Sequence, residues 1–410
     1  MPDRRRKSMA RVLRVVIIDD VTTYRKILTI VIGEFIGVEC VGEFPDGGSG
    51  MKGIEKLQPD LVFLDVEMPV MNGIEVLKEV KERFPEIGVI MVSSYDRKQA
   101  DITVRALELG AIDFIPKPSE TSIEENIDIL KKKIAPLIHV ISTRKNLERI
   151  KQITGRVTED ITKKDEPPKQ QPKPQKETYI ERIPEPKIIV PETVIPQEVP
   201  AVEKAHKQER LYAPFKIDLV AIGTSTGGPY ALAEVIPNLP KDFPVPIVIV
   251  QHMPPNFTAS LANSLSKKSN IPVYEAKKGD VVAPGKILLA PGGFHMVLKA
   301  HESIKDRYVI DLEETPQVHG CRPSVDVLFK SIAHNFVGNV LSVVMTGMGS
   351  DGTDGVRALK TKKCYCLIQD EETSVVFGMP KMVMQAKLQD ETLALEGIAG
   401  RITEIVKLSR

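Results

Sequence analysis

Residues 217–236 read IDLVAIGTSTGGPYALAEVI, and this stretch decides the fold of the C-terminal half of the chain. A short apolar run, Ile217–Ile222, leads into a Gly-rich turn, and residues with helical spacing follow from Pro229. Proline suits the first turn of a helix, because the N–H groups there have no partner within the helix. A buried strand, a sharp turn and a helix in this order form the repeating unit of an α/β fold.

The same alternation continues towards the C-terminus. Short runs rich in Val and Ile predict buried parallel strands, and segments with helical spacing predict the helices between them. Further strands are expected at Pro246–Val250, Lys286–Ala290 and Val340–Met345, and helices at Tyr230–Ile236, Val325–His334 and Thr353–Lys362. Residues 213–408 are therefore predicted to form one α/β domain around a doubly wound parallel sheet.

A second alternation of strands and helices occupies the N-terminal part of the chain. Strands are expected at Leu13–Ile18, Leu61–Leu64, Val89–Val92 and Asp113–Ile115, and helices at Thr22–Ile36, Gly73–Arg83 and Gln99–Leu109. We predict a second doubly wound α/β domain over residues 12–133. Its functional site should lie outside the carboxyl ends of the strands.

The two domains are separated by residues 134–212, for which we predict a helical extension and then a linker. From about Thr154 to Tyr212 the chain is dominated by Pro, Lys, Glu and Gln, as in EPPKQQPKPQKE, and it has no helical periodicity. Such a composition buries too little apolar surface to form a core. We therefore expect a semi-extended, Pro-rich linker.

Bulk composition limits the possible classes of function. A chain of 410 residues accommodates two domains, and its net charge of +1 does not favour nucleic acid or an anionic membrane as a partner. Its four cysteines do not suggest a disulfide framework, and Cys364 and Cys366 lack the further ligands of a zinc site. The basic N-terminus has no cleavage signal, and no apolar run approaches the roughly 20 residues of a membrane span. We expect a cytoplasmic protein without membrane insertion.

Three acidic residues follow strands of the N-terminal domain. Asp19 and Asp20 end the first expected strand, and Asp65 ends another, in LVFLDVEMP. Because parallel strands end on the same side of a sheet, the three carboxylates should meet at one edge. They would repel each other unless a cation lay among them, and hard oxygen ligands suit Mg²⁺. The sequence therefore predicts a magnesium site at this edge.

Ser93 and Lys117 follow the next two strands, in VIMVSS and IPKP. A hydroxyl and an ammonium beside a metal-bound carboxylate suit phosphoryl transfer onto Asp65, with Lys117 neutralising the phosphoryl oxygens and Ser93 sensing them. Each residue alone would suggest a helix cap or a surface lysine. The specificity lies in the ordered set of two Asp, one Asp, Ser and Lys at successive strand ends.

With this ordered set, the region from about Val12 to Lys131 resembles the receiver domains of response regulators, which have a flavodoxin-like fold. The resemblance implies that a histidine kinase phosphorylates Asp65. The metal-binding positions of the family match Asp19, Asp20, Asp65 and the backbone carbonyl of Glu67. Its switch positions match Ser93, Phe114 and Lys117.

The turn after Ile217–Ile222 contains a G-x-S-x-G motif centred on Ser225. A serine on a sharp strand-to-helix turn presents its hydroxyl at the sheet edge, where the helix N-terminus offers N–H groups to an oxyanion. A dinucleotide site is the alternative, but Ser225 replaces its second glycine, and His252 ends the next strand where an acidic residue would bind ribose. An imidazole at that position suits a general base for the serine.

A third polar residue should orient the imidazole. Asp351, in SVVMTGMGSDGTDG, again follows an apolar strand and could fix the tautomer of His252. Asp354 is the local alternative, and His295 and His319 are alternatives to His252 as the base. The order Ser–His–Asp differs from the order Ser–Asp–His of α/β-hydrolases, which argues against a lipase-like enzyme.

Five motifs, AIGTSTGGP, QHMPPNFT, APGGFHM, RPSVDVLF and VMTGMGSDG, make residues 217–405 similar to the Rossmann-like catalytic domain of bacterial chemotaxis protein-glutamate methylesterases. The order of receiver, linker and esterase domain also matches that family. By position, the resemblance implies a nucleophile, a base, an orienting acid and two oxyanion contacts: Ser225, His252, Asp351, Thr226 and the backbone N–H of Met348. It implies no cofactor at the esterase site. The chain departs from the family in its long linker and at Cys321, where His is expected.

The resemblance implies a phosphorylation-activated enzyme that demethylates glutamate γ-methyl esters on methyl-accepting chemotaxis receptors and deamidates glutamines there. A chemotaxis histidine kinase would be the phosphodonor. A signalling adaptor with a nonfunctional α/β module is an alternative from another class. A DNA-binding regulator is disfavoured, because the C-terminal half has neither a helix-turn-helix pattern nor a basic bias.

Overall fold

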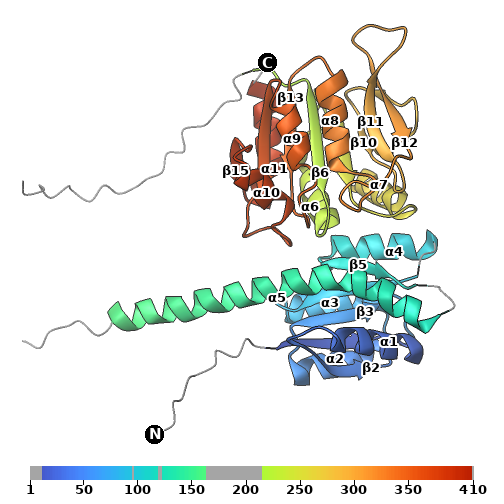
Figure 1. Ribbon diagram of the computed structural model, residues 1–410, viewed down its shortest axis with the longest axis vertical. Coiled ribbons are helices and arrows are strands. Elements are labelled where there is room, and N and C mark those ends of the chain that lie inside the picture. The colour runs from blue at the N-terminus through green and yellow to red at the C-terminus, as the bar shows by residue number, and fades with distance from the viewer. Residues whose placement is uncertain (1–11, 95–96, 119–121, 163–214, 409–410) are drawn as a thin grey trace, which may run out of the picture. The chain divides into compact units, whose positions relative to one another are not determined.

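A computed structural model describes residues 12–94, 97–118, 122–162 and 215–408. It contains one α/β domain before the linker and one after it (Figure 1). The basic N-terminal segment and the Pro-rich stretch from residue 163 to Tyr212 lie outside the described residues.

The N-terminal domain is built on a parallel sheet with the strand order β2-β1-β3-β4-β5. These strands are β1 (Leu13–Ile18), β2 (Val38–Phe44), β3 (Leu61–Asp65), β4 (Gly88–Ser93) and β5 (Asp113–Pro116). The chain leaves β1 for β2 on one side and returns to β3 on the other. The carboxyl end of β1 therefore lies at the switch point where doubly wound sheets bind ligands.

Helices cover both faces of this sheet. One face carries α2 (Gly47–Leu57), α3 (Gly73–Arg83) and α4 (Arg97–Glu108), and the other carries α1 (Thr22–Gly33) and α5 (Ile123–Thr162). Successive residues of β1 alternate between the two apolar cores, because side chains along a strand point to opposite faces. The predicted doubly wound architecture is confirmed for this domain. The sequence reading did not identify β2 or α2.

Helix α5 continues past residue 133, where the N-terminal domain was expected to end and a helical extension to begin. Its buried residues Ile134, Leu137, Ile138 and Ile141 belong to the core of the N-terminal domain, so the boundary expected at residue 133 falls inside the helix. The backbone is helical up to Thr162, whereas we expected no helix after Thr154. Extending a helix that is already nucleated adds one hydrogen bond per residue at little entropic cost, so the weakly periodic residues 154–162 continue the helix.

The C-terminal domain is built on a second parallel sheet, with the strand order β15-β14-β13-β6-β7-β10-β8. These strands are β6 (Leu219–Thr224), β7 (Ile247–Gln251), β8 (Val273–Glu275), β10 (Ile287–Leu289), β13 (Val340–Val344), β14 (Cys364–Gln369) and β15 (Glu391–Leu393). The central strand β6 lies between β7 and β13. Residues that follow these three strands therefore gather at one edge of the sheet.

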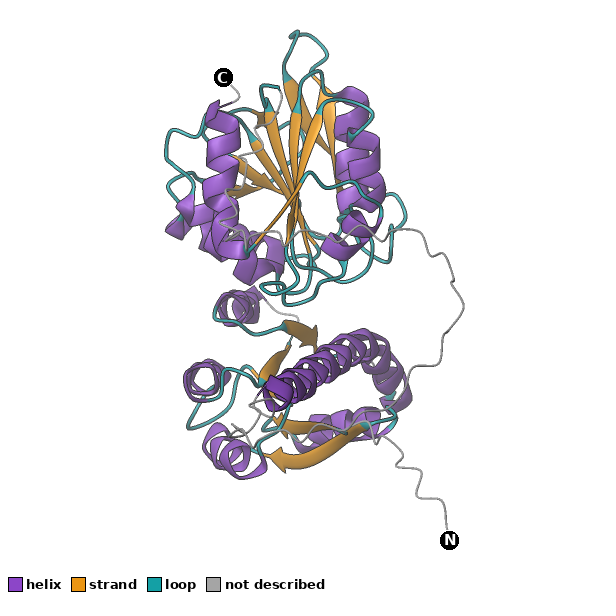
Figure 2. Cartoon of the chain, turned by 90° about the vertical axis from the view of Figure 1, so that its left-hand side faces the viewer, coloured by secondary structure: helices purple, strands orange, loops and turns teal. Residues whose placement is uncertain are grey.

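Figure 2 shows helices on both faces of this sheet. One face packs against α6 (Gly228–Val235), α7 (Phe257–Lys268) and α11 (Leu395–Leu408). The other packs against α8 (Val325–Asn335), α9 (Thr353–Leu359) and α10 (Met379–Gln385). This arrangement agrees with the predicted doubly wound fold.

An antiparallel sheet in the C-terminal domain was not predicted. It has the order β11-β12-β9, from β9 (Val281–Val282), β11 (His295–Ala300) and β12 (Tyr308–Glu313). Its apolar residues, such as Met296 and Leu298, join the core that contains α8. None of the helices in the described ranges combines the length and apolar character that a membrane-spanning helix needs.

Candidate functional sites

Ser225 follows β6 directly and lies in the turn before α6. Its N–H donates a hydrogen bond of 3.0 Å to the carbonyl of Thr346, which follows β13. The next glycine, Gly227, has φ of 77°, a conformation that side chains disfavour, and a Cβ there would lie 2.5 Å from Val375 Cβ. The turn therefore requires a glycine at this position and holds the serine between β6 and β13.

His252 follows β7, the other neighbour of β6. Its N–H donates to the carbonyl of Thr224 at 3.1 Å. Its side-chain Nε2 lies 2.6 Å from Oδ2 of Asp351, which comes from the turn between β13 and α9. The structure thus brings together His252 and the acid that the sequence pairs with it.

Asp351 is buried and held by the N-terminus of α8. Its Oδ1 accepts hydrogen bonds from Ser324 Oγ at 2.9 Å and from the N–H of Asp326 at 2.9 Å, and its Oδ2 accepts from the N–H of Val325 at 2.7 Å. These donors include N–H groups that a helix leaves without an internal partner. They fix the carboxylate and favour its charged form.

Burial disfavours the charged forms of His252 and Asp351, whereas their contact favours them. Burial disfavours the imidazolium, but the hydrogen bond with Asp351 and the nearby Cys321 outweigh it and raise the pKa of His252 to about 9. Burial also disfavours the Asp351 carboxylate, but its bonds from His252 and from the N–H groups of α8 lower its pKa. The arrangement therefore stabilises an imidazolium–carboxylate pair.

Within the described part of the chain, no hydrogen bond joins Ser225 Oγ to the imidazole. Because Nε2 faces Asp351, Nδ1 is the nitrogen left to accept a proton from the serine. In the same ranges, the N–H groups of Thr226 and Met348 donate no hydrogen bond. The neighbouring Gly347 approaches Ser225 so closely that a Cβ there would lie 2.8 Å from the Ser225 Cβ.

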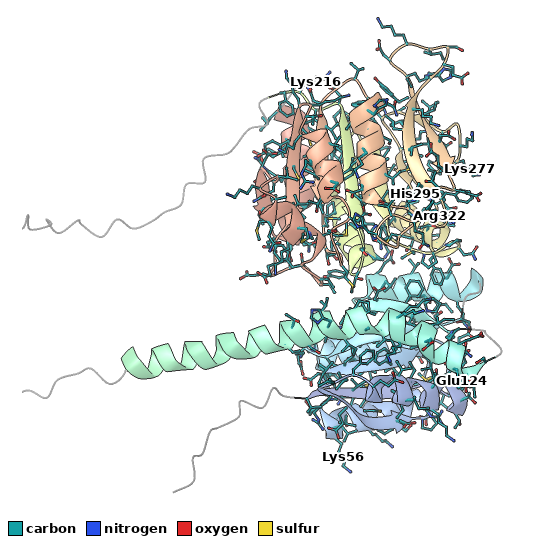
Figure 3. The ribbon with its side chains drawn as sticks, in the orientation of Figure 1. Lys56, Glu124, Lys216, Lys277, His295 and Arg322 are labelled. Atoms are coloured by element: carbon teal, nitrogen blue, oxygen red, sulfur yellow. The ribbon has the colours of Figure 1, made fainter. Side chains whose placement is uncertain are left out.

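The alternative residues have other partners. His319 Nε2 lies 3.1 Å from Asp326 Oδ2, and Asp354 is an exposed partner of Arg357. His295 begins β11 and is buried, with Nε2 3.1 Å from the carbonyl of Pro316 (Figure 3). None of these contacts involves Ser225 or His252.

The acidic residues of the N-terminal domain meet as expected at the sheet edge. Carboxylate oxygens of Asp19, Asp20 and Asp65 lie within 4.8 Å of one another. Lys117 Nζ lies 2.7 Å from Asp65 Oδ2 and 2.9 Å from Asp19 Oδ2. The second contact is an ion pair without hydrogen-bond geometry, so Asp19 Oδ2 is a buried oxygen without a hydrogen-bond donor. Three clustered carboxylates and this oxygen fit a hard divalent cation.

Burial and charge repulsion both disfavour the ionised form of Asp65. Burial and the nearby charge of Asp19 raise the pKa of Asp65 to about 6, despite the contact with Lys117. Burial lowers the pKa of Lys117, but Asp65 and Asp19 outweigh it and raise that pKa. An additional cation would relieve the same repulsion.

Ser93, Glu67 and Phe114, the other residues expected at this site, have their own contacts. Ser93 ends β4 and is fully buried, with Oγ 3.1 Å from Gln99 Oε1 and 2.8 Å from Thr103 Oγ1. Glu67 Oε2 accepts a hydrogen bond from Gln99 Nε2 at 3.1 Å, and Phe114 lies on β5 opposite Met91 of β4. The side chains of Ser93 and Glu67 are thus linked through Gln99.

Sequence reasoning missed several residues that hold the Ser–His–Asp set in place. Ser324, the N-cap of α8, bonds Asp351, and its position before a helical segment is a signal that could have identified the cap. Gln251 and Thr346 bond the turn that carries Ser225. Their sequence context gives no comparable signal, because these contacts depend on strand order.

Two family models match the chain. The model described as response regulator receiver domain matches residues 15–128, and the one described as CheB methylesterase matches residues 220–402. A protein-glutamate methylesterase/protein-glutamine glutaminase of Desulfotalea psychrophila is 39% identical over 97% of this chain and 99% of its own length. A protein of the same name from Bacillus subtilis is 37% identical over 97% and 99%.

Solved structures match each domain separately. The CheB methylesterase catalytic domain of Thermotoga maritima is 42% identical, covers 47% of this chain and all of that chain, and has a TM-score of 0.45. The response regulator domain of Thermotoga maritima CheB is 36% identical, covers 32% of this chain and 98% of that chain, and has a TM-score of 0.29. Because full-length relatives cover nearly the whole chain and both family models match it, the chain belongs to the CheB family of receiver-linked protein-glutamate methylesterases/protein-glutamine glutaminases.

Proposed function

We propose that this chain is a phosphorylation-activated serine hydrolase that demethylates glutamate γ-methyl esters on chemoreceptors and deamidates glutamines there. The observation that carries the proposal is the 2.6 Å contact between His252 and Asp351, at the end of the strand next to the one that delivers Ser225. A serine and an imidazole at neighbouring strand ends, with a carboxylate bonded to the imidazole, suit acyl transfer. The names of the relatives support the choice of substrate.

Acyl transfer would begin with attack of Ser225 Oγ on the γ-carbonyl carbon. His252 Nδ1 takes the serine proton, and the tetrahedral intermediate places negative charge on the former carbonyl oxygen. Collapse breaks the carbon–oxygen bond of the ester, and the imidazolium protonates the departing methoxide to give methanol. With a glutamine substrate the same proton leaves with ammonia. Water, deprotonated by His252, then hydrolyses the acyl-enzyme to glutamate.

The N–H groups of Thr226 and Met348 are the proposed oxyanion donors. Both belong to turns that carry the site, and neither donates another hydrogen bond in the described ranges. Asp351 would stabilise the imidazolium that forms at each transition state. Its fixed hydrogen bonds from α8 mean that it needs no rearrangement during the reaction.

We further propose Asp65 as the phosphoryl acceptor and Lys117 as the ammonium that neutralises phosphoryl oxygens, which its 2.7 Å contact with Asp65 supports. Asp19, Asp20, Asp65 and the Glu67 carbonyl would hold Mg²⁺, which supplies charge neutralisation for phosphoryl transfer when bound. Ser93 and Phe114 would form the switch. In the unphosphorylated chain, the Ser93 hydroxyl is held by Gln99 and Thr103.

Phosphorylation would relieve inhibition of the esterase by the receiver. The kinase of a chemotaxis pathway would supply the phosphoryl group, and receptor glutamates would be the substrate. We expect this regulation to take place in the cytoplasm. No nucleic acid is required.

The nucleophile can be tested independently of the receptor. The protein is treated with a fluorophosphonate, and the modified residue is identified by peptide mass spectrometry. We expect a single adduct on Ser225, none in Ser225→Ala, and loss of methanol release from methylated receptor membranes in that variant. Release at the wild-type rate by Ser225→Ala would overturn the assignment. An adduct on Ser225 without any methanol release would retain the hydrolase and reject the substrate.

A further inference from the structure

We propose that Gln251 is a positioning residue of the hydrolase, because one side-chain amide holds the backbones of both the nucleophile and the base. The inference rests on the proposed roles of Ser225 and His252. Gln251 is the last residue of β7 and is 2% exposed. It touches no reacting atom, so its effect on the reaction would be transmitted through the two residues that it holds.

Three hydrogen bonds define its position. The Nε2 group donates to the carbonyl of Ser225 at 2.9 Å and to the carbonyl of His252 at 3.0 Å. The Oε1 atom accepts from the hydroxyl of Thr224 at 2.6 Å. Carbonyl oxygens can only accept hydrogen bonds, so the amide nitrogen of Gln251 must face them. This requirement fixes the positions of Nε2 and Oε1.

The side-chain bonds of Gln251 lie where the pairing between β6 and β7 ends. Thr224 and Gln251 are the last paired residues of β6 and β7, and Ser225 and His252 each come one residue later. Beyond that pair, the backbone link between the two segments is the bond from the His252 N–H to the Thr224 carbonyl. The Gln251 amide extends the link to both catalytic residues. A displacement of about 1 Å in such a site can reduce the rate on the order of 100-fold.

The local sequence makes room for this side chain. Gly228 begins α6 opposite Gln251, and a Cβ at that position would collide with Gln251 Oε1. The absence of a side chain at Gly228 thus leaves room for the buried Gln251 amide to bond the Ser225 carbonyl. The need for glycine at position 228 is therefore steric and does not depend on its backbone conformation.

Gln369 provides a matched control. It is the last residue of β14, is completely buried, and also uses both ends of its amide. Its Oε1 accepts from the Thr346 N–H at 2.8 Å, and its Nε2 donates to the Thr373 carbonyl at 2.9 Å. These bonds touch neither Ser225 nor His252 directly, and they reach the nucleophile only through Thr346, whose carbonyl accepts the Ser225 N–H. Removing them should therefore cost stability without separating the two catalytic residues.

The test compares Gln251→Met with Gln369→Met in the full-length protein. Methionine has nearly the shape of glutamine but forms neither set of bonds. For Gln251→Met we expect kcat to fall roughly 10- to 100-fold with KM within about two-fold, and fluorophosphonate labelling of Ser225 to slow by the same factor. Gln369→Met should lose a similar amount of Tm but keep kcat within about three-fold.

Thr224→Val is a milder second variant that keeps the shape of the side chain and should fold. It removes the hydroxyl that orients the amide, so kcat should fall in the same direction but less, and combining it with Gln251→Met should add no further loss. The proposal is overturned if both methionine variants lose kcat by the same factor for the same loss of Tm. It is also overturned if Gln251→Met raises KM while kcat is unchanged. Failure of the wild-type protein to label at Ser225 would instead overturn the proposed function.

Discussion

His252 must be neutral to act as a base, but its surroundings stabilise the imidazolium. With a pKa of about 9, most molecules at neutral pH carry the imidazolium. The base form grows as the pH rises. We therefore expect the labelling rate of Ser225 to increase roughly tenfold per pH unit below pH 9 and then to level off, measured as fluorophosphonate kinetics from pH 6 to 10. A profile already level at pH 7 would contradict this.

Cys321 lies close to the imidazole of His252 and contributes to raising its pKa. Replacing it by Ala should lower the pKa and shift the rising part of the labelling profile to lower pH, with little change in the plateau. Cys366→Ala serves as a control, because that buried cysteine lies on β14 and bonds the Leu367 carbonyl. Equal profiles for wild type and Cys321→Ala would show that the thiol does not tune the base.

We expect Asp351 to contribute strongly to kcat. Asp351→Asn keeps most of the geometry but cannot accept the same set of hydrogen bonds from α8 and His252. By analogy with the equivalent change in serine proteases, kcat should fall on the order of 10³- to 10⁴-fold. Methanol release measured beside the thermal unfolding midpoint would separate this loss from a loss of folding. A fall of less than tenfold in a folded variant would reject Asp351 as the orienting acid.

At the scale of elements, the strand ends create both sites. The ends of β1 and β3 bury Asp65 beside Asp19, and burial, together with the charge of Asp19, raises the pKa of Asp65 to about 6 from its usual 3.8. The folded protein then binds the proton more tightly than the unfolded chain. Between pH 3.8 and 6 stability falls as the pH rises, and above pH 6 the full cost remains.

Asp65→Asn should therefore stabilise the metal-free receiver at pH 7, by an amount on the order of 1–3 kcal/mol, and have little effect near pH 3.5. Denaturant unfolding of the full-length protein, followed for the receiver transition with a chelator present, measures this difference. A variant that is less stable than wild type at pH 7 would show that the contact between Asp65 and Lys117 outweighs the repulsion.

The elements differ in how far the sequence could predict them. Runs such as Leu13–Ile18 and segments such as Gly73–Arg83 have strong periodicity and caps, and they form with the expected bounds. The strand β2 is not fully buried and lacks a continuous apolar run, so it escaped notice. The short strands β9 and β15 depend on partners distant in sequence. The contact of Gln251 with Ser225 has the same origin, because it requires β6 and β7 to be neighbours.

At the scale of the whole molecule, the order of domains links a phosphoryl acceptor to a hydrolase. If the receiver inhibits the esterase, deleting residues 1–210 should raise basal methanol release. Deletion together with Ser225→Ala should leave no activity and serves as the control. An unchanged basal rate in a folded, fluorophosphonate-reactive fragment would mean that the receiver does not act by inhibition.

The most direct test of the account is methanol release from methylated chemoreceptor membranes, with and without a small phosphodonor and Mg²⁺. Wild type, Asp65→Asn and Ser225→Ala are compared. We expect the phosphodonor to accelerate release in wild type, Asp65→Asn to keep only the basal rate, and Ser225→Ala to release nothing. Acceleration that persists in Asp65→Asn, or release that persists in Ser225→Ala, would contradict it.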